Sequence, residues 1–291
     1  MATSMTAQPR ERVSHTPDDV SIHPRKMEFP FSDITQPYFF AGNSLLTVFF
    51  AALSSTFPAG EAEFIASVRN YRERITDPVL KEQIRGFIGQ EGHHSHQHKK
   101  ANEVLRDLGI DAVRLEKHLE RDIARLTKRK FATDKFRLAL TVGLEHMTAI
   151  MAEFVLTHPE VLEPLEPSVR DLLYWHAVEE IEHKAVAFDV YMQQEGDRKY
   201  LRRALKFVTW MFTIRISCYM VALLFWKRKL PGMADIRGFR RFLYGAKGMI
   251  TNIRQPYRDF FKEDFHPWDH DNRDLIDKWQ TQLRKQPETV G

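Results

Sequence analysis

The sequence of 291 residues has little of three features that often identify a class of protein. It contains one cysteine, Cys218, which excludes an intrachain disulfide and a zinc site built from several cysteines, and which fits a reducing cytoplasm. Its 43 Lys and Arg residues against 39 Asp and Glu residues leave a net charge of only +4, too even a balance to indicate a nucleic-acid partner. Residues 1–25 lack the apolar core of a secretory signal, and their polar composition predicts a disordered tail. We therefore expect a cytoplasmic protein that does not bind nucleic acid.

Apolar and polar residues almost never alternate with a period of two after this tail, so strands are not expected. Apolar residues recur at helical spacing instead, and 43% of the chain is hydrophobic, enough for a sizeable core. Asp77-Pro78 and Pro167-Ser168 are typical helix starts, and Gly109 and Gly196 are typical helix ends. The expected helices are 41–56, 60–75, 78–108, 111–130, 133–157, 166–195, 198–229, 235–254 and 272–285, with a looser segment from 256.

Two Glu-x-x-His motifs, Glu91/His94 and Glu180/His183, stand out in this helical pattern. Each follows a lone glutamate about thirty residues upstream, Glu61 in the first case and Glu145 in the second. Ferritin-like four-helix bundles deliver four carboxylates and two imidazoles to a pair of metal ions in this order. A single such motif is usually a solvated surface pair, but four ionised carboxylates converging in a core would be costly without cations. The series therefore predicts a dinuclear metal centre.

The expected fold follows from that series. We expect an all-α protein with a ferritin-like four-helix bundle over residues 26–196. Additional C-terminal helices over residues 197–291 are expected to pack on the bundle as part of the same domain.

Helical geometry indicates which neighbouring side chains join the centre, because successive residues turn by about 100°. Glu179 lies at the margin of the inner face and Glu182 further round, whereas His93 and His96 point away from it. The residues that share the inner face are Glu91, His94 and His98 on the earlier helix and His176, Glu180 and His183 on the later one.

Several of these assignments leave alternatives open. His98 and His176 are either further ligands or core histidines hydrogen-bonded to a carboxylate. Glu63 competes with Glu61 for the first position. His146, about 100° from Glu145, is expected to support a ligand rather than to be one. Lys184 is most simply a solvated charge.

The quoted motifs resemble those of a bacterial family labelled predicted metal-dependent hydrolases, placed in the ferritin-like superfamily. The resemblance covers roughly residues 22–285 and implies Glu61 rather than Glu63 as the ligand, with histidines matching His98 and His176. A more distant likeness, to di-iron arylamine N-oxygenases, rests on His176 four residues before Glu180 and implies a third imidazole. The strings that carry the family resemblance are Phe57-Pro58-Ala59-Gly60-Glu61, Gln90 to His98, Leu144-Glu145-His146-Met147-Thr148-Ala149, Trp175 to His183 and Phe265-His266-Pro267-Trp268.

Three functions fit this ligand set. The first is a di-iron oxidoreductase or oxygenase that uses O2 and an external electron donor to oxidise a small, hydrophobic substrate. Manganese or a mixed pair would suit the same ligands. In this reading Glu179 and Thr148 take part in catalysis, although the Thr148 hydroxyl could equally bond back to a helix carbonyl. The second is hydrolysis by a metal-bridging hydroxide, as the family label implies, and the third is iron binding without an organic substrate.

The run from Phe207 to Trp226 is mostly apolar and has basic residues at both ends. Its length permits a membrane span, but Arg215 in its middle would be costly in lipid without a partner. It fits equally an interfacial contact, peripheral to the inner membrane, or a helix that packs on the bundle and lines a substrate channel. A homodimer is also compatible with the sequence.

Overall fold

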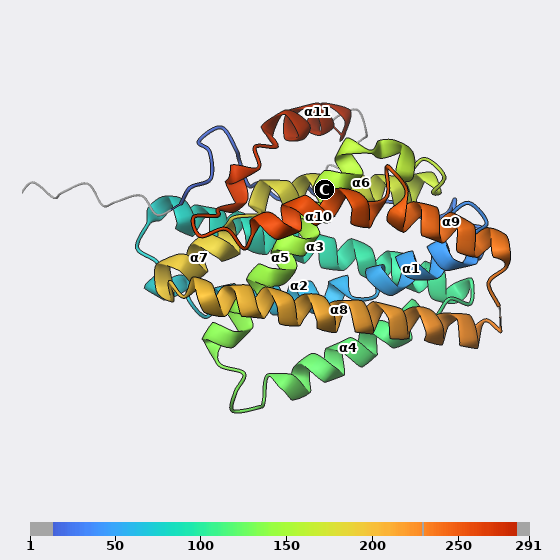
Figure 1. The fold of residues 1–291 in the computed structure, drawn as a ribbon, viewed down its shortest axis with the longest axis horizontal. Coiled ribbons are helices and arrows are strands. Elements are labelled where there is room, and N and C mark those ends of the chain that lie inside the picture. The colour runs from blue at the N-terminus through green and yellow to red at the C-terminus, as the bar shows by residue number, and fades with distance from the viewer. Residues whose placement is uncertain (1–13, 229, 284–291) are drawn as a thin grey trace, which may run out of the picture.

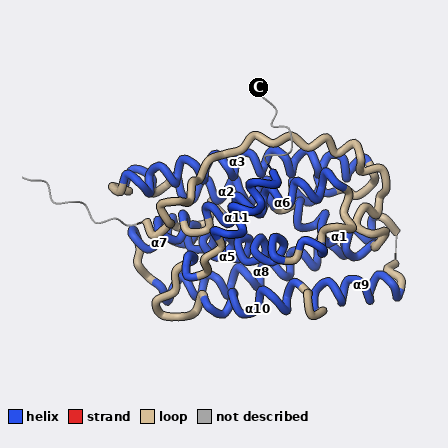
Figure 2. Tube along the Cα trace, turned by 90° about the horizontal axis from the view of Figure 1, so that it is seen from above, coloured by secondary structure: helices blue, strands red, loops and turns tan. Residues whose placement is uncertain are grey.

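The computed structural model describes residues 14–228 and 230–283 (Figure 1). These residues form helices and no strand, apart from one isolated bridge between Phe40 and Leu165, so the all-α expectation is confirmed for this part of the chain. The two longest helices, Pro78–Asp107 and Arg198–Trp226, lie roughly along one direction (Figure 2). The helices are α1 (Ser44–Ser54), α2 (Phe57–Arg69), α3 (Pro78–Asp107), α4 (Ala112–Leu126), α5 (Asp134–Thr157), α6 (Pro167–His183), α7 (Val186–Gln194), α8 (Arg198–Trp226), α9 (Met233–Tyr244), α10 (Met249–Asp259) and α11 (Arg273–Leu283).

Four helices contact one another in a closed ring: α2 with α3, α3 with α6, α6 with α5, and α5 with α2. Several of these helices begin and end where the sequence predicts. Asp77 accepts a hydrogen bond from the Val79 N–H at the start of α3, α6 begins at Pro167, and Gly109 has the positive φ of +78° that favours glycine after a helix. The sequence predicts each of these helix ends because each depends on local backbone chemistry.

Two expected helices are each divided in the structure. The segment 166–195 breaks at Lys184 and Ala185 into α6 and α7, and the sequence has neither Gly nor Pro there to signal it. The segment 235–254 breaks between Gly245 and Gly248 into α9 and α10, a glycine pair that our reading passed over. The expected looser segment from 256 is also wrong at its start, because α10 continues through Pro256 to Asp259.

Residues 14–25, assigned to a disordered tail, instead form an extended strap along α3 and α6. Ser14 is buried and its backbone N–H donates to Asp77. A side chain at Gly86 would meet the carbonyl oxygen of Ile22 at 2.1 Å, so this glycine lets the strap approach the helix closely. The strap is irregular, as expected, but it is held by burial and tertiary hydrogen bonds that its own polar composition does not reveal. Residues 1–13 of the expected tail lie outside the described residues.

The outer helices cover the ring on several sides. The helix α8 packs along α1 and α5, α9 packs on α1, α10 packs on α5 and α11 packs on α6. The buried apolar residues form two clusters, one of which includes Trp175 and the other Phe87. Trp175 packs edge-on against His94 and Phe87 packs against His183, so both clusters border the polar interior described below.

Candidate metal centre

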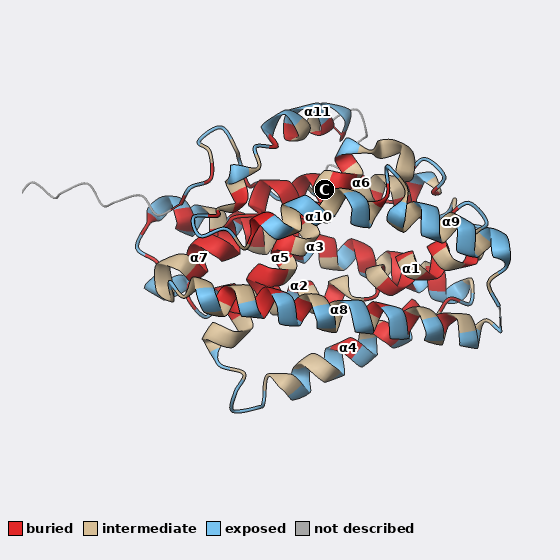
Figure 3. Ribbon diagram, in the orientation of Figure 1, coloured by how far each residue is buried: buried red, intermediate tan, exposed pale blue. Residues whose placement is uncertain are grey.

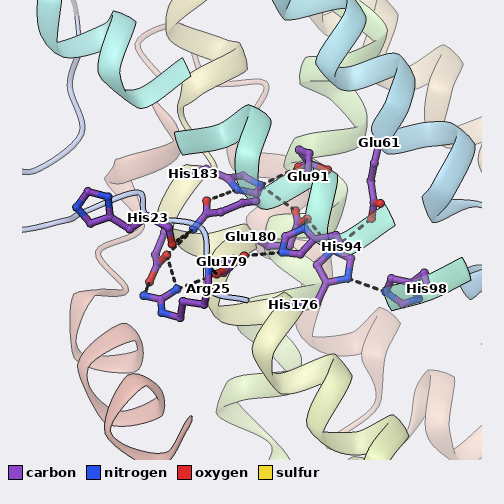
Figure 4. A network of polar contacts seen from close by, with 12 residues as sticks. His23, Arg25, Glu61, Glu91, His94, His98, His176, Glu179, Glu180 and His183 are labelled. Atoms are coloured by element: carbon purple, nitrogen blue, oxygen red, sulfur yellow. Dashed lines mark hydrogen bonds and ion pairs between the residues drawn. The ribbon is translucent and has the colours of Figure 1, made fainter. Parts of the chain in front are cut away.

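Six acidic and imidazole side chains from the four ring helices converge in the interior, and Figure 4 shows Glu61, Glu91, His94, Glu180 and His183 among them. The Glu-x-x-His spacing puts both members of each motif on the inner face of its helix. Every one of the six is at most 3% exposed. They are Glu61 from α2, Glu91 and His94 from α3, Glu145 from α5, and Glu180 and His183 from α6.

The donor atoms fall into overlapping groups, each spanning less than 4.8 Å. One group joins Glu91, Glu145 and His183, and a second joins Glu91 and His94 with Glu180. His183 Nε2 lies 3.1 Å from Glu91 Oε1 and 3.5 Å from Glu145 Oε2. Because Glu91 belongs to both groups, the arrangement suits two adjacent cations that share a carboxylate.

A third group joins Glu61 and His94 to His176. His176 Nε2 lies 2.8 Å from Glu180 Oε1 and 3.8 Å from Glu61 Oε1, and its ring stacks on that of His94 at 4.0 Å between centroids. The structure therefore brings His176 among the carboxylates, where it could add a third imidazole to the centre.

The most telling property of the cluster is its unsatisfied polar atoms. Buried polar atoms in native proteins normally have hydrogen-bond partners. Here both carboxylate oxygens of Glu61, Glu91 and Glu145 are buried without a hydrogen bond, and so are one oxygen of Glu180, Nδ1 of His94 and Nε2 of His183. These oxygen and imidazole donors belong to the ligand classes that iron, manganese and zinc accept. The residues present thus fit a pair of bound cations.

Electrostatics in the metal-free protein support the same conclusion. Burial, followed by repulsion from neighbouring carboxylates, raises the pKa of Glu61 and of Glu145 well above the ordinary value. Burial also raises the pKa of Glu91. Burial opposes ionisation of Glu180, but its contacts with His183 and His176 outweigh this and hold its pKa well below the usual range. Bound cations would stabilise all four carboxylates in the ionised form.

Hydrogen bonds from outside the cluster orient the imidazoles of the two motifs. His183 Nδ1 lies 2.9 Å from Gln90 Oε1, an acceptor, so Nδ1 carries a proton and Nε2 faces the carboxylates. His94 Nε2 lies 2.9 Å from Glu179 Oε2, which leaves its Nδ1 facing the cluster without a hydrogen bond. Glu179 therefore orients His94 from outside the cluster.

His98 belongs to a chain of hydrogen bonds that ends on His176. Ser54 Oγ donates to Asn102 Oδ1 at 2.8 Å, so the same oxygen accepts from His98 Nδ1 at 3.0 Å. His98 Nε2 then accepts from His176 Nδ1 at 2.9 Å, and His176 Nε2 faces Glu180 and Glu61. Both ring nitrogens of His98 are thus engaged, which favours a supporting role for His98 over direct ligation.

Arg25 and Glu182 are the parts of the site that sequence reasoning missed. Arg25, on the strap, binds Glu182 through both terminal nitrogens at 2.6 and 2.9 Å and Glu179 through Nη1 at 3.1 Å. Glu182 also accepts a hydrogen bond from Gln90 at 2.8 Å. The Arg25 guanidinium thus holds Glu179, which orients His94. It also holds Glu182, which binds the Gln90 side chain that orients His183. Burial still raises the pKa of Glu179 to about 8, despite the opposing charge of Arg25.

The remaining candidates lie elsewhere. Glu63 forms an ion pair with Arg137 at 2.6 Å, and the ring of His146 packs against Phe260 and Phe265 rather than beside a ligand. Burial lowers the pKa of His146 to about 3. His96 is exposed and His93 is half-buried, as expected for side chains that point away from the inner face of α3.

Lys184 is buried, which corrects the expectation of a solvated charge. Its ammonium donates to the His270 carbonyl and to Asn272 and lies 3.9 Å from the Trp268 ring, and burial lowers its pKa to about 7. The Phe265–Trp268 motif thus packs where α6 ends, with Phe265 buried against His146.

Two apolar cavities reach the cluster. A cavity of about 410 Å³ between α2, α4, α5 and α8 extends to Glu61, with Phe57, Leu144 and Met211 among its walls. A smaller one of about 90 Å³ reaches His176 and Glu180. Thr148 borders both, and its hydroxyl donates to the Glu145 carbonyl at 3.0 Å, the alternative to a catalytic role.

Comparison with known families agrees with this geometry. The profile of a family described as predicted metal-dependent hydrolase matches residues 23–271. The chain belongs to this family. The matched region begins at the strap, contains all six converging residues and His176, and ends just after the Phe265–Trp268 motif. No curated protein and no solved structure matches the chain.

Proposed function

We propose that this chain is a dinuclear metal enzyme with a ferritin-like bundle, which holds two iron ions and uses O2 to oxidise a small, hydrophobic substrate. The observation that carries the proposal is the set of converging buried donor atoms without hydrogen bonds, next to cavities with apolar walls. Two iron ions, when bound, would supply electrons for the reduction of O2, with an external donor restoring them.

In this proposal the ring helices supply Glu61, Glu91, His94, Glu145, Glu180 and His183 as ligands, with His176 as a third imidazole. The four carboxylates balance the charge of the cations, and the three imidazoles present lone pairs in orientations set from outside the cluster.

The walls of the cavities would do two things for such a reaction. Phe57, Leu53 and Met151 border both cavities and would keep water away from the centre while an apolar substrate binds beside it. Thr148 could turn its hydroxyl from the Glu145 carbonyl toward the cavity only by giving up its present hydrogen bond.

Hydrolysis by a metal-bound hydroxide is the second candidate, and the family description favours it. Hydrolysis requires groups that stabilise a developing oxyanion and protonate a leaving group. The smaller cavity has few such groups, because its polar lining residues are Thr148 and the proposed ligands His176 and Glu180. The larger cavity also has Thr141, Arg137 and Arg215 in its lining, so the lining alone does not separate the two reactions.

Metal analysis of protein purified without added metal tests the shared part of both proposals. We expect about two transition ions per chain, iron rather than manganese in the first proposal. Anaerobic loading with Fe(II) followed by exposure to O2 should then give O2 consumption and a change in visible absorption. Many irons per chain would indicate iron storage instead, and turnover of ester substrates by anaerobic protein would indicate hydrolysis.

A further inference from the structure

We propose that the outer face of α8, α9 and α10 docks on the surface of an anionic lipid bilayer. The first observation is where exposed apolar side chains gather. Among the described residues, thirteen large hydrophobic side chains are exposed, and eleven of these lie between Phe207 and Ile250. Single exposed apolar residues are ordinary, but a concentration on one face marks an interaction surface. The outer face is defined here by Phe207, Trp210, Ile214, Val221, Phe225, Leu230, Met233, Ile236, Tyr244 and Ile250.

The side chains on α8 form a stripe at helical spacing. Phe207, Trp210, Ile214, Val221 and Phe225 follow one another by three, four or seven residues, which puts them on one side of the helix. The polar residues Thr213 and Ser217, between them in sequence, donate their hydroxyls to carbonyls one turn earlier in the same helix, both at 2.8 Å. These hydroxyls need no water as a partner, so the stripe can lie against lipid without leaving them unsatisfied.

The three helices lie on one side of the ring. Both α8 and α9 pack on α1, and both α8 and α10 pack on α5. The two ribbon views place all three on the same side of the ring, and exposed residues recur along α8 and α9 (Figure 3). Leu230 in the connection between α8 and α9 is 89% exposed, and Met233 at the start of α9 is 72% exposed. The apolar surface is therefore shared by neighbouring elements rather than confined to one helix.

The positive charge of this region indicates which kind of partner it binds. Between Arg198 and Arg258 the sequence has fifteen Lys and Arg residues and a single acidic residue, Asp235. Asp235 turns inward, where the Ser44 hydroxyl donates to it at 2.9 Å. On α9, Arg237, Arg240 and Arg241 are exposed beside the apolar side chains. Basic residues around an apolar face complement an anionic lipid surface, whereas the chain as a whole, at +4, is nearly balanced.

The buried face of α8 favours a contact at the surface over a span. Three helical segments of the described chain are long and apolar enough to cross a membrane: Ser44–Arg74, Asp134–Thr157 and Arg198–Trp226. The most apolar stretch of the third is 28% buried, against 56% and 61% for the others. Yet Leu205 and Val208 on its inner side are fully buried, and Arg215 pairs with Asp122 of α4 at 3.0 Å. A spanning α8 would break these contacts.

The same three helices border the two cavities, which gives the docking a use within the proposed function. Phe242 of α9 and Met249 of α10 line the smaller cavity, and Met211 and Phe212 of α8 line the larger one. A docked protein would hold these walls next to the bilayer, from which an apolar substrate could enter. This last step rests on the proposed function, but the docking itself does not.

Flotation of the full-length protein with lipid vesicles tests the proposal. We expect binding to phosphatidylcholine vesicles that contain about 30% phosphatidylglycerol, weaker binding to pure phosphatidylcholine, and release at about 0.5 M salt. Val221→Glu should weaken binding at least about ten-fold, because it puts a charge into the apolar stripe. Val79→Glu is the matched control, since Val79 is an exposed valine on α3. Arg240→Glu should weaken binding about five-fold, and Lys81→Glu should not.

Several outcomes would overturn the proposal. One is a folded, metal-containing protein that does not float with the anionic vesicles, and another is equal loss from Val221→Glu and Val79→Glu. A dimer in solution that Val221→Glu dissociates, without vesicle binding, would assign the face to a second copy of the chain. Glu91→Ala keeps the test separate from the enzyme proposal, because a variant without metal should still bind vesicles.

Discussion

Helices α6 and α8 depart from the usual pattern of burial in opposite ways, because α6 buries charged side chains and α8 exposes apolar ones. Helix α6 buries Glu179, Glu180 and Glu182, all at most 3% exposed, whereas α8 exposes Trp210 and Phe225, at 62% and 77%. Charged residues are rarely buried without partners, and large apolar residues are rarely exposed in a contiguous patch. Arg25 partners Glu179 and Glu182, but Glu180 keeps one oxygen without a hydrogen bond. We therefore propose cations as the partner in the first case and lipid as the partner in the second.

The largest effect, on metal content, should come from removing a proposed ligand on α3 or α6. Glu91→Ala is expected to abolish binding of at least one of the two ions, because Glu91 belongs to two of the donor groups. His96→Ala, on the exposed side of the same helix, should leave metal content unchanged. Metal analysis of both variants measures this. Equal metal loss in the two would refute the assignment of an inner face.

A smaller effect is expected at Arg25, which touches no proposed ligand. Arg25→Ala would free Glu179 and Glu182, which orient His94 and, through Gln90, His183. Loss of such support typically lowers metal affinity about 10- to 100-fold. Competition with a chelator measures the affinity, and Arg25→Lys should recover part of it. Unchanged affinity in Arg25→Ala would show that the strap is only structural.

The stability of the metal-free protein should depend on pH through Glu145. Its pKa is raised on folding, so the folded state holds this proton more tightly than the unfolded state, and the free energy of unfolding should fall as pH rises from about 4.5 through the folded pKa. The loss is about 1.4 kcal/mol for each unit of the shift. Glu145→Gln should remove this contribution. Urea unfolding with a chelator, at several pH values from about 4.5 upward, compares the variant with the parent; identical pH profiles would contradict the raised pKa.

The smallest effect is expected on the outer face. Val221→Glu should change the free energy of unfolding by less than about 0.5 kcal/mol, because the side chain is 66% exposed. Leu205→Ala, on the buried side of the same helix, should cost about 2–5 kcal/mol. Thermal or urea unfolding in solution checks both values. A large loss in Val221→Glu would mean that this face is packed within the protein rather than open to lipid.

Much of the fold could be predicted from local features of the sequence. The helical spacing, the Asp77-Pro78 start and the Gly109 stop depend on backbone chemistry within a few residues, and all three are confirmed. The break at Lys184 was not legible, because the turn is held by His270 and Asn272, more than eighty residues away. His98 is the corresponding case in the site: its spacing puts it on the inner face, but Ser54 and His176 occupy its nitrogens.

By itself the sequence determined which side chains share the inner faces of two helices, because side-chain direction along a helix follows from its 3.6-residue period. It also predicted a polar interior that could hold cations, since burying charge alone is costly. Only the tertiary structure decided that an irregular strap brings Arg25 to the back of the site, and that α8 lies with one side buried and the other exposed. Both depend on contacts between segments far apart in the chain, which no local pattern records.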